Sequence, residues 1–207
     1  MPTPFQKCVF INCPLDEAYE PILQAVLFCV VYLGFSPRLA TERIDSGEVR
    51  LQKIRRLIES SKYSIHDLSR SQAGKKGEFF RLNMPFELGI DYACRSYMKG
   101  RRSKKILILE EKRYRYQAAL SDISGCDVRT HSGSFERAVR QVRNWLVSEG
   151  RIRADGAGKI VGAYADFQQW YYDRLLAAGF SPADIQDYPT SELLRGMKTW
   201  MSKGKPI

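Results

Sequence analysis

The chain has 207 residues, of which 44% are hydrophobic and 27% charged, a balance typical of a folded globular protein and not of a disordered tail. Its formal net charge is +10, but the basic residues are dispersed and no recognisable nucleic-acid-binding module accompanies them. No apolar run approaches the roughly 18 residues that a membrane-spanning helix needs, and the first residues lack the pattern of a secretion signal. We therefore expect no membrane segment and a cytoplasmic location.

The sequence holds five cysteines and two histidines. The cysteines are odd in number, scattered, and contain no C-x-x-C pair, so we expect buried free thiols that behave as small hydrophobic side chains. Two histidines leave a zinc site with few ligands. We predict neither a bound metal nor a resident cofactor.

Apolar runs and helical periodicities alternate along the first three quarters of the chain. The predicted strands are residues 7–12, 35–40, 62–68, 104–110 and 127–131. The predicted helices between and after them are residues 16–33, 49–60, 83–97 and 134–147. The uninterrupted ILIL within 104–110 is typical of a strand that is buried on both faces. This alternation predicts an α/β fold with a parallel five-stranded sheet and helices on both faces.

The chain divides into a main domain, a linker and a tail. Residues 1–148 form the predicted α/β domain, residues 149–162 are rich in Gly, Arg and Ala and indicate a linker, and residues 163–207 indicate a small helical appendage. Within the appendage we expect helices at 163–178, 181–185 and 191–203. Its aromatic side chains could pack on the main domain, on a second copy or on a partner protein, and the first is favoured: Trp170, Tyr171, Tyr172 and Trp200.

Polar residues gather where the predicted strands end. In an open parallel α/β sheet, ligands lie outside the carboxyl ends of the strands, so these residues are the candidates for a nucleotide-like small molecule. The candidate binding residues that follow the first three strands or begin the next helix are Asp16, Arg43, Asp45, Asp67, Ser69, Arg70 and Asn83. The candidate catalytic residue is Glu87.

The segment RLNMPFELGIDYA is the most informative. Asn83 suits a helix N-cap, Pro85 is tolerated in a first turn, and Glu87 shares a helix face with Asn83 because the two are four residues apart. The helix N-terminus is expected to favour ionised Glu87. Such a carboxylate could hold ribose hydroxyls, stabilise an oxocarbenium-like centre or attack an anomeric carbon. An ordinary helix-start glutamate that complements the dipole is the alternative.

Two aspartates are ambiguous in the same way. Asp67 stands at a strand end, where it can bind a ligand, but Asp-x-Ser is also common turn chemistry. Asp16 could contact a ligand or cap the first helix. His66 alternates with Asp67 along its strand, so we expect it on the opposite side as a packed, hydrogen-bonded histidine. The absence of a G-x-G-x-x-G motif and of a P-loop argues against the common dinucleotide and NTP folds.

Three segments, VFINCPLDEAY, HDLSR and NMPFELGID, resemble the nucleoside 2-deoxyribosyltransferase-like and TIR-like group of flavodoxin-like domains. The resemblance covers roughly residues 6–147. It implies that Glu87 takes the position of the glutamate that works on an N-glycosidic bond. It also places Asp67 and Asn83 at neighbouring ligand-binding positions and Asp16 in the loop after the first strand. Bacterial members of this group are often linked to defence against phage by consuming NAD or other nucleotides.

The leading hypothesis is therefore a hydrolase of the N-glycosidic bond in NAD or a related nucleotide. Glu87 would act on the ribosyl centre, Asn83 and Asp67 would position the ribose, and Arg70 or Arg43 would meet phosphate. One alternative is a nucleotide-binding sensor that signals through the helical appendage without catalysis. Another is an RNA or DNA interaction module carried by residues 99–105, which the dispersed charge disfavours.

Overall fold

The protein is seen in a computed structural model that describes residues 4–42, 44–70 and 82–205. Its sheet has five strands, all parallel, in the order β2-β1-β3-β4-β5. The strands are β1 (Cys8–Asn12), β2 (Ser36–Arg38), β3 (Tyr63–Asp67), β4 (Lys105–Glu110) and β5 (Arg129–Thr130). This is the flavodoxin-like strand order, in which the direction of winding reverses between β1 and β3. The predicted parallel five-stranded α/β sheet is confirmed.

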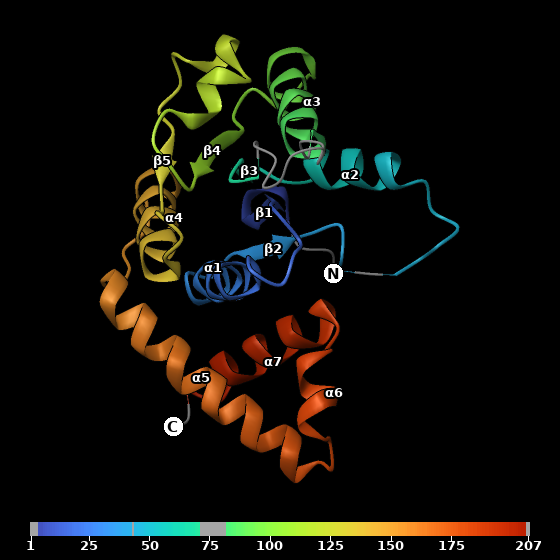
Figure 1. Ribbon diagram of the computed structural model, residues 1–207, viewed down its shortest axis with the longest axis vertical. Coiled ribbons are helices and arrows are strands. Elements are labelled where there is room, and N and C mark those ends of the chain that lie inside the picture. The colour runs from blue at the N-terminus through green and yellow to red at the C-terminus, as the bar shows by residue number, and fades with distance from the viewer. Residues whose placement is uncertain (1–3, 43, 71–81, 206–207) are drawn as a thin grey trace.

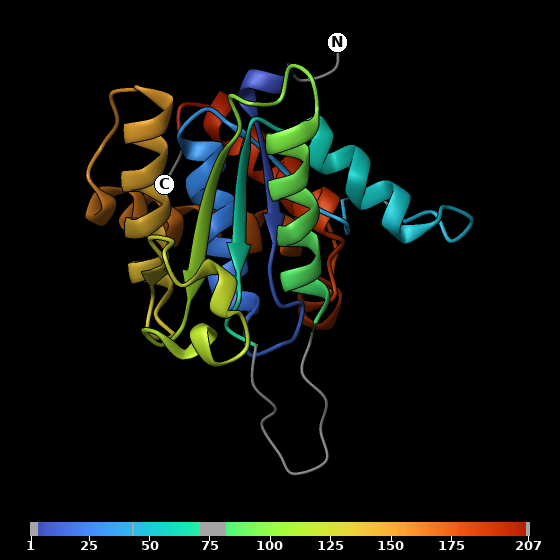
Figure 2. The ribbon, with the colours of Figure 1, turned by 90° about the horizontal axis from the view of Figure 1, so that it is seen from above.

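Helices cover both faces of the sheet (Figure 1). On one face lie α1 (Glu20–Tyr32) and α4 (Phe135–Gly150), and on the other lie α2 (Arg50–Glu59) and α3 (Asn83–Tyr97). Right-handed crossovers require this split, because the chain winds toward β2 through α1 and then back across the sheet through α2 and α3. Single-turn 3₁₀ helices precede β1 and bridge β4 to β5: η1 (Phe5–Lys7), η2 (Arg115–Ala118) and η3 (Ser121–Ile123). Figure 2 shows β1, β3 and β4 side by side, pointing to the same edge.

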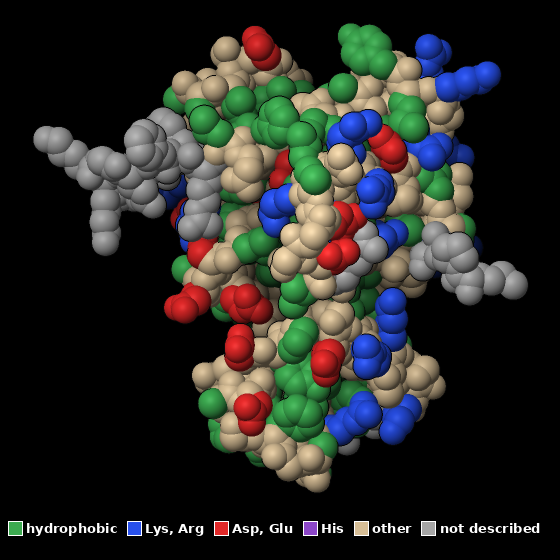
Figure 3. Space-filling view, turned by 90° about the vertical axis from the view of Figure 1, so that its right-hand side faces the viewer, with side chains coloured by type: hydrophobic (Ala, Val, Ile, Leu, Met, Phe, Trp, Pro, Cys, Tyr) green, Lys and Arg blue, Asp and Glu red, His purple; other side chains and the backbone are tan. Residues whose placement is uncertain are grey.

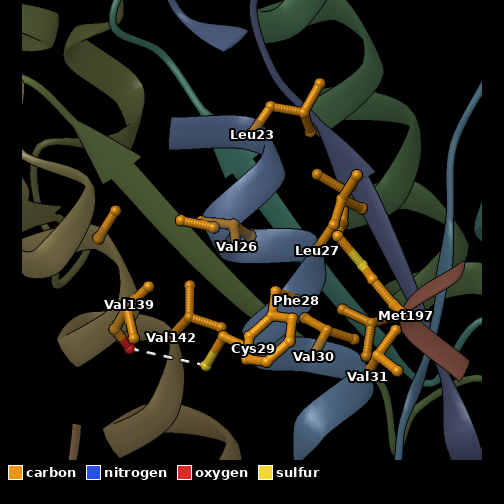
Figure 4. Packing of buried hydrophobic residues seen from close by; sticks show 14 of the residues in the cluster. Leu23, Val26, Leu27, Phe28, Cys29, Val30, Val31, Val139, Val142 and Met197 are labelled. Atoms are coloured by element: carbon orange, nitrogen blue, oxygen red, sulfur yellow. Dashed lines mark hydrogen bonds between the residues drawn. The ribbon is translucent and has the colours of Figure 1, made fainter. Parts of the chain in front are cut away.

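Helix α1 is buried on nearly all sides. Nine of its residues are buried: Ile22, Leu23, Ala25, Val26, Leu27, Phe28, Cys29, Val30 and Val31. Figure 4 shows Val26 and Cys29 turned toward Val139 and Val142 of α4, while Leu27 lies beside Met197. The Cys29 thiol donates to the Val139 carbonyl at 3.8 Å. A helix this apolar has no solvent face, so it requires a second layer of protein beyond the sheet.

That second layer is the C-terminal helical part, made of α5 (Ala157–Ala177), α6 (Pro182–Gln186) and α7 (Thr190–Ser202). Phe28 of α1 packs against Phe167 and Trp200, with ring centroids 5.4 and 5.6 Å apart. Trp200 and Tyr171 belong to the same hydrophobic cluster as the strands, whereas Tyr172 is exposed. The prediction that the tail packs on its own chain is confirmed for these buried rings.

The connection to the helical part is shorter than the predicted linker 149–162. α4 continues to Gly150 and α5 begins at Ala157, so the irregular stretch is residues 151–156. Gly158 and Gly162 disfavour a helix intrinsically, but Ile160 is fully buried, and packing of this kind outweighs propensity.

The buried contact between α7 and α5 depends on a glycine. A Cβ added at Gly196 would lie 2.8 Å from Cδ2 of Tyr171, a ring that is already stacked on Phe167 with centroids 5.3 Å apart. We expect Gly196→Ala to lower the free energy of unfolding by about 1 kcal/mol, because overpacking outweighs the gain in helix propensity. Gly162→Ala, on α5 with open space around it, should raise that free energy by up to about 1 kcal/mol. Urea denaturation measures both, and a stabilised Gly196→Ala would contradict the packing argument.

The cysteines are free, and four of the five are buried, as predicted, while Cys126 is half-buried. None of the described helices combines the length and the apolar character that crossing a bilayer would require. Within the described ranges, no three His, Cys, Asp or Glu side chains are grouped so that they could hold a metal ion.

Candidate functional site

The carboxyl ends of β1 and β3 are neighbours, and the loops that follow them are joined by an ion pair. Asp16 accepts hydrogen bonds from Arg70 Nε at 3.1 Å and from Nη2 at 3.0 Å. The same carboxylate accepts a hydrogen bond from the Tyr19 backbone N–H at 3.1 Å, which closes the turn before α1. Asp16 therefore acts as a turn cap and also fixes one loop to the other at the point where the winding direction changes.

Asp67, at the end of β3, is fully buried and surrounded by donors. Its carboxylate accepts from the Tyr19 hydroxyl at 2.7 Å, from the Ser69 backbone N–H at 2.9 Å and from the Ser69 hydroxyl. His131 Nε2 lies 3.1 Å away. Burial alone would raise the pKa of Asp67, but the hydrogen bonds from His131, Ser69 and Tyr19 outweigh it and hold this pKa below its ordinary value. Asp67 is thus a buried, ionised anchor.

The cluster of Asp67, Ser69 and His131 does not have the geometry of a nucleophilic triad. Ser69 Oγ lies 2.9 Å from His131 Nε2, and the Asp67 carboxylate contacts that same nitrogen. The other ring nitrogen, Nδ1, accepts from the Gly133 backbone N–H at 3.1 Å. A triad needs the carboxylate on the nitrogen opposite the serine. All three side chains are also buried, so the cluster shapes the edge of the sheet.

Glu87 occupies a different position, on the α3 side of the same edge. Glu87 is 5% exposed and lines a cavity of about 80 Å³. The other polar side chains around the cavity come from β1, from the loop after β2 and from the first turns of α2 and α3: Asn12, Thr41, Arg50 and Asn83. The predicted pairing of Asn83 with Glu87 around one site is therefore present. The cavity has room for about two or three water molecules, at roughly 30 Å³ each.

Burial raises the pKa of Glu87 to about 7, and the positive charge of Arg50 lowers it only in part. The helix N-terminus was expected to favour ionised Glu87, but the net shift of its pKa is in the opposite direction. α3 begins at Asn83, so Glu87 lies beyond the first turn, where the dipole effect fades and desolvation dominates. Asn83 is also not the N-cap, because Leu82 holds that position without a side-chain cap.

Two oxygen-bearing groups that line this cavity have no hydrogen-bond partner among the described residues. Among the described residues, none donates a hydrogen bond to the Glu87 carboxylate. The Thr41 hydroxyl oxygen is buried and likewise without a partner in the described part of the chain. Buried polar groups are usually satisfied, so the unpaired Thr41 hydroxyl beside a carboxylate without an internal donor makes the cavity suited to a polar ligand.

A buried hydrogen-bond chain fixes the start of α3 to the sheet. The Asn12 side-chain amide donates to the Met84 carbonyl at 2.9 Å and to His66 Nδ1 at 3.0 Å. His66 Nε2 donates in turn to Asp91 at 3.0 Å. The prediction that His66 is a packed histidine facing away from Asp67 is confirmed. This hydrogen-bond chain links β1 to α3 and so fixes the position of Glu87.

Cys13 directly follows β1 and lies close enough to Asp67 and Glu87 to feel both charges. Burial raises the pKa of its thiol well above the ordinary value, and the negative charges of Asp67, Glu20 and Glu87 raise it further. The thiolate is the nucleophilic form of cysteine. Cys13 is therefore protonated at neutral pH and is not a candidate nucleophile, although it stands beside the site.

The remaining predicted binding residues lie apart from the Glu87 cavity or cannot be placed. Asp45 is exposed and accepts from the Gly47 backbone N–H at 3.0 Å, so it forms a turn. Arg43 lies outside the described residues. Ser69 and Arg70 belong to the Asp67 and Asp16 clusters, respectively.

Sequence reasoning missed three residues of this edge. Arg50 and Thr41 reach the cavity because they follow the carboxyl end of β2, and that position was the available signal. His131 follows β5, two strands from Asp67, and reaches the cluster only through the way the chain folds. No local spacing could have indicated it.

The basic segment 99–105 lies at the opposite, amino-terminal edge of the sheet, before β4. Three of its five cations bond to other groups of the protein, whereas Lys99 and Arg102 are exposed. Lys104 is 1% exposed and pairs with Asp91 at 3.1 Å. Arg101 donates to the Glu59 carbonyl at 2.6 Å, and Lys105 pairs with Glu149 at 2.8 Å. Such a patch offers few free cations for a nucleic-acid backbone.

The raised pKa of Glu87 predicts a specific pH dependence of stability. Below pH 4.5 the carboxyl is protonated in both states, and between 4.5 and about 7 only the unfolded state ionises, so folded-state stability falls as pH rises. Above about pH 7, this group lowers the free energy of unfolding by about 3 kcal/mol relative to pH 4.5. Relative to wild type, Glu87→Gln should be more stable by about this amount at pH 8 and equally stable at pH 4.5. Urea denaturation at the two pH values measures it, and a pH-independent difference would refute the assignment.

The fold and this edge define an α/β protein with a flavodoxin-like sheet, a polar site where the winding reverses, and a C-terminal helical part. No protein-family model, curated protein or solved structure matches the chain.

Proposed function

We propose that the protein hydrolyses the N-glycosidic bond of NAD or a related nucleotide, with Glu87 as the reacting carboxylate. The observation that carries the proposal is the Glu87 cavity: a buried carboxylate without an internal hydrogen-bond donor among the described residues, at the edge where α/β sheets bind ligands. A carboxyl group with a pKa of about 7 beside a cation is the kind of perturbed group that marks a functional site.

In this proposal the bond from the ribose anomeric carbon to the base breaks, and its electron pair leaves with the base. Positive charge then develops at the anomeric carbon, and ionised Glu87 stabilises it. A water molecule adds to that carbon and loses its proton to Glu87 or to solvent. Asn83 would hold a ribose hydroxyl, and Arg50 would meet a phosphate at the mouth of the cavity. The small volume admits the reacting part of the ligand only, so the rest would lie outside.

Asp67, Ser69 and Arg70 have a supporting part in this scheme. The Asp67 carboxylate is already engaged by Tyr19 and Ser69, and Arg70 is held by Asp16. Asp67 and Ser69 therefore fix the edge from the α1 side. Arg70 would contact a phosphate only by giving up its pair with Asp16.

The test is incubation of the pure full-length chain with NAD, NADP, nucleosides and nucleotides, followed by chromatography for free base. We expect base release from at least one dinucleotide or nucleotide. Because the ionised form of Glu87 is the active one, kcat/KM should rise between about pH 6 and 8. Release of no base from any compound that binds would overturn the hydrolase proposal.

A second candidate is a nucleotide sensor that uses the same edge without catalysis. It is favoured by one observation: Tyr19, which contacts Asp67, immediately precedes α1, and α1 is the helix on which the C-terminal helical part packs. Ligand binding at the edge could thus reach those helices. The sensor predicts a raised thermal unfolding midpoint with ligand and no free base in the same incubation.

A further inference from the structure

A second and larger cavity, of about 490 Å³, lies between the first half of α1 and the C-terminal helices. Its floor is apolar and partly aromatic, formed by Leu23 and Leu27 of α1 and by Phe167 and Tyr171 of α5. The volume falls in the range of cavities that hold small organic molecules. This cleft is separate from the Glu87 cavity, with which it shares no lining residue.

The rim of the cleft is rich in primary amides. Four glutamines line it: Gln24, Gln168, Gln169 and Gln186. Gln24 donates to Glu20 at 2.8 Å and Gln169 donates to Asp173 at 2.9 Å. Within the described part of the chain, the side-chain amides of Gln168 and Gln186 have no hydrogen-bond partner. Each can donate and accept at once, which matches the alternating donors and acceptors on the edge of a heteroaromatic ring.

Tyr171 of α5 and Tyr188 of the loop between α6 and α7 both line the cleft, and Phe180 supports Tyr188 from outside it. Tyr171 meets Tyr188 edge to face with ring centroids 5.8 Å apart, and Tyr188 meets Phe180 in the same way at 5.6 Å. The position of Tyr171 is set from behind by the close approach of Gly196. Rings held in this way are pre-organised to stack on or pack against a planar ligand.

The charge of the cleft restricts the ligand further. Among the described residues that line it, no Lys or Arg is present, and Glu20 is the single charged side chain. A phosphate would meet a carboxylate without a compensating cation. The interspersed amides equally disfavour an acyl chain, because burial against it would leave them without hydrogen bonds.

From the aromatic floor, the free amides and the missing cation, we propose that the cleft between α1 and the C-terminal helices binds an uncharged planar heteroaromatic molecule, a free nucleobase or a nucleoside. The proposal does not depend on Glu87. On the face seen in Figure 3, the helical lobe carries hydrophobic side chains, with acidic side chains mostly to one side of them and basic ones to the other.

The test is calorimetric titration of the full chain with adenine, adenosine and AMP, with hydrogen–deuterium exchange to locate the site. We expect adenine or adenosine to bind and to protect peptides from 163–177 and 185–193, and AMP to bind at least about tenfold more weakly there. The double variant Gln168→Ala/Gln186→Ala should weaken that binding roughly tenfold. Both glutamines are exposed, so the variant keeps the fold. Gln52→Ala, which removes an exposed glutamine of α2, is the matched control.

Three outcomes would overturn the proposal. They are no binding of either uncharged compound, protection confined to residues around Glu87, and equal binding of AMP in the cleft. Sedimentation adds a fourth: a dimer that Gln168→Ala/Gln186→Ala dissociates would assign the cleft to a second copy of the chain. Glu87→Gln leaves cleft binding unchanged if the two sites are independent, so failure here is distinguishable from failure of the hydrolase proposal.

Discussion

Glu87→Gln is expected to lower base release by about 10²–10⁴-fold while the protein stays folded. Glutamine keeps the size of the side chain in the cavity but removes the negative charge that stabilises the ribosyl centre. The loss should appear mainly in kcat, since the charge is needed when positive charge develops and not when the substrate docks. Initial rates of base release, measured by chromatography at pH 8, provide the comparison.

The matched control for this variant is Glu59→Gln. Glu59 lies at the end of α2, forms a weak surface pair with Arg55 at 3.8 Å, and lines neither of the two cavities described above. Its replacement should leave turnover within about twofold of wild type. If Glu87→Gln releases base as fast as Glu59→Gln, Glu87 is not the reacting carboxylate.

Lys104→Met should lower the free energy of unfolding by about 3–5 kcal/mol. The Lys104 ammonium is fully buried, donates to the Ile58 carbonyl at 2.8 Å and to the Ser61 carbonyl, and pairs with Asp91 at 3.1 Å. Methionine fills similar space but leaves the Asp91 carboxylate with an uncompensated charge and removes one donor from each of the two carbonyls. Burial alone would raise the pKa of Asp91, but His66 and Lys104 outweigh it and keep this pKa low, which marks the carboxylate as ionised.

The neighbouring residue provides the control. Lys105 is exposed and pairs with Glu149 at 2.8 Å on the surface, so Lys105→Met should cost less than about 1 kcal/mol. Urea denaturation of the two variants tests the contrast. Equal losses would mean that the buried pair contributes no more than the exposed one.

The strands and their parallel pairing were predictable because each strand has a local pattern and the elements alternate along the chain. The ILIL run of β4 indicates a strand covered on both faces, and alternating strands and helices imply parallel pairing. The same rule placed Asn83 and Glu87 at the carboxyl-terminal edge of the sheet. Local pattern was enough wherever the relevant neighbours follow from topology.

The electrostatics of the edge could not be predicted, because they depend on three-dimensional packing. The pKa of Glu87 is set by how deeply α3 buries it, which no spacing in NMPFELGID encodes. The partnership of Asp67 with His131 joins residues 64 positions apart, and the burial of Lys104 depends on Asp91 lying across from it. The length of the linker was overestimated for a related reason. Its glycine content predicts an irregular segment, whereas the burial of Ile160 stabilises a helix there.

The burial of α1 has a consequence for how the protein can be divided. α1 packs on one side against the sheet and α4 and on the other side against the C-terminal helices. Neither of these two layers covers the apolar surface of α1 alone. Excision of residues 157–207 would leave Leu27, Phe28 and Val31 facing water, and the excised helices would lose the surface that orders them. The two halves therefore form one cooperative folding unit, and neither is suited to independent expression or to exchange between proteins as a module.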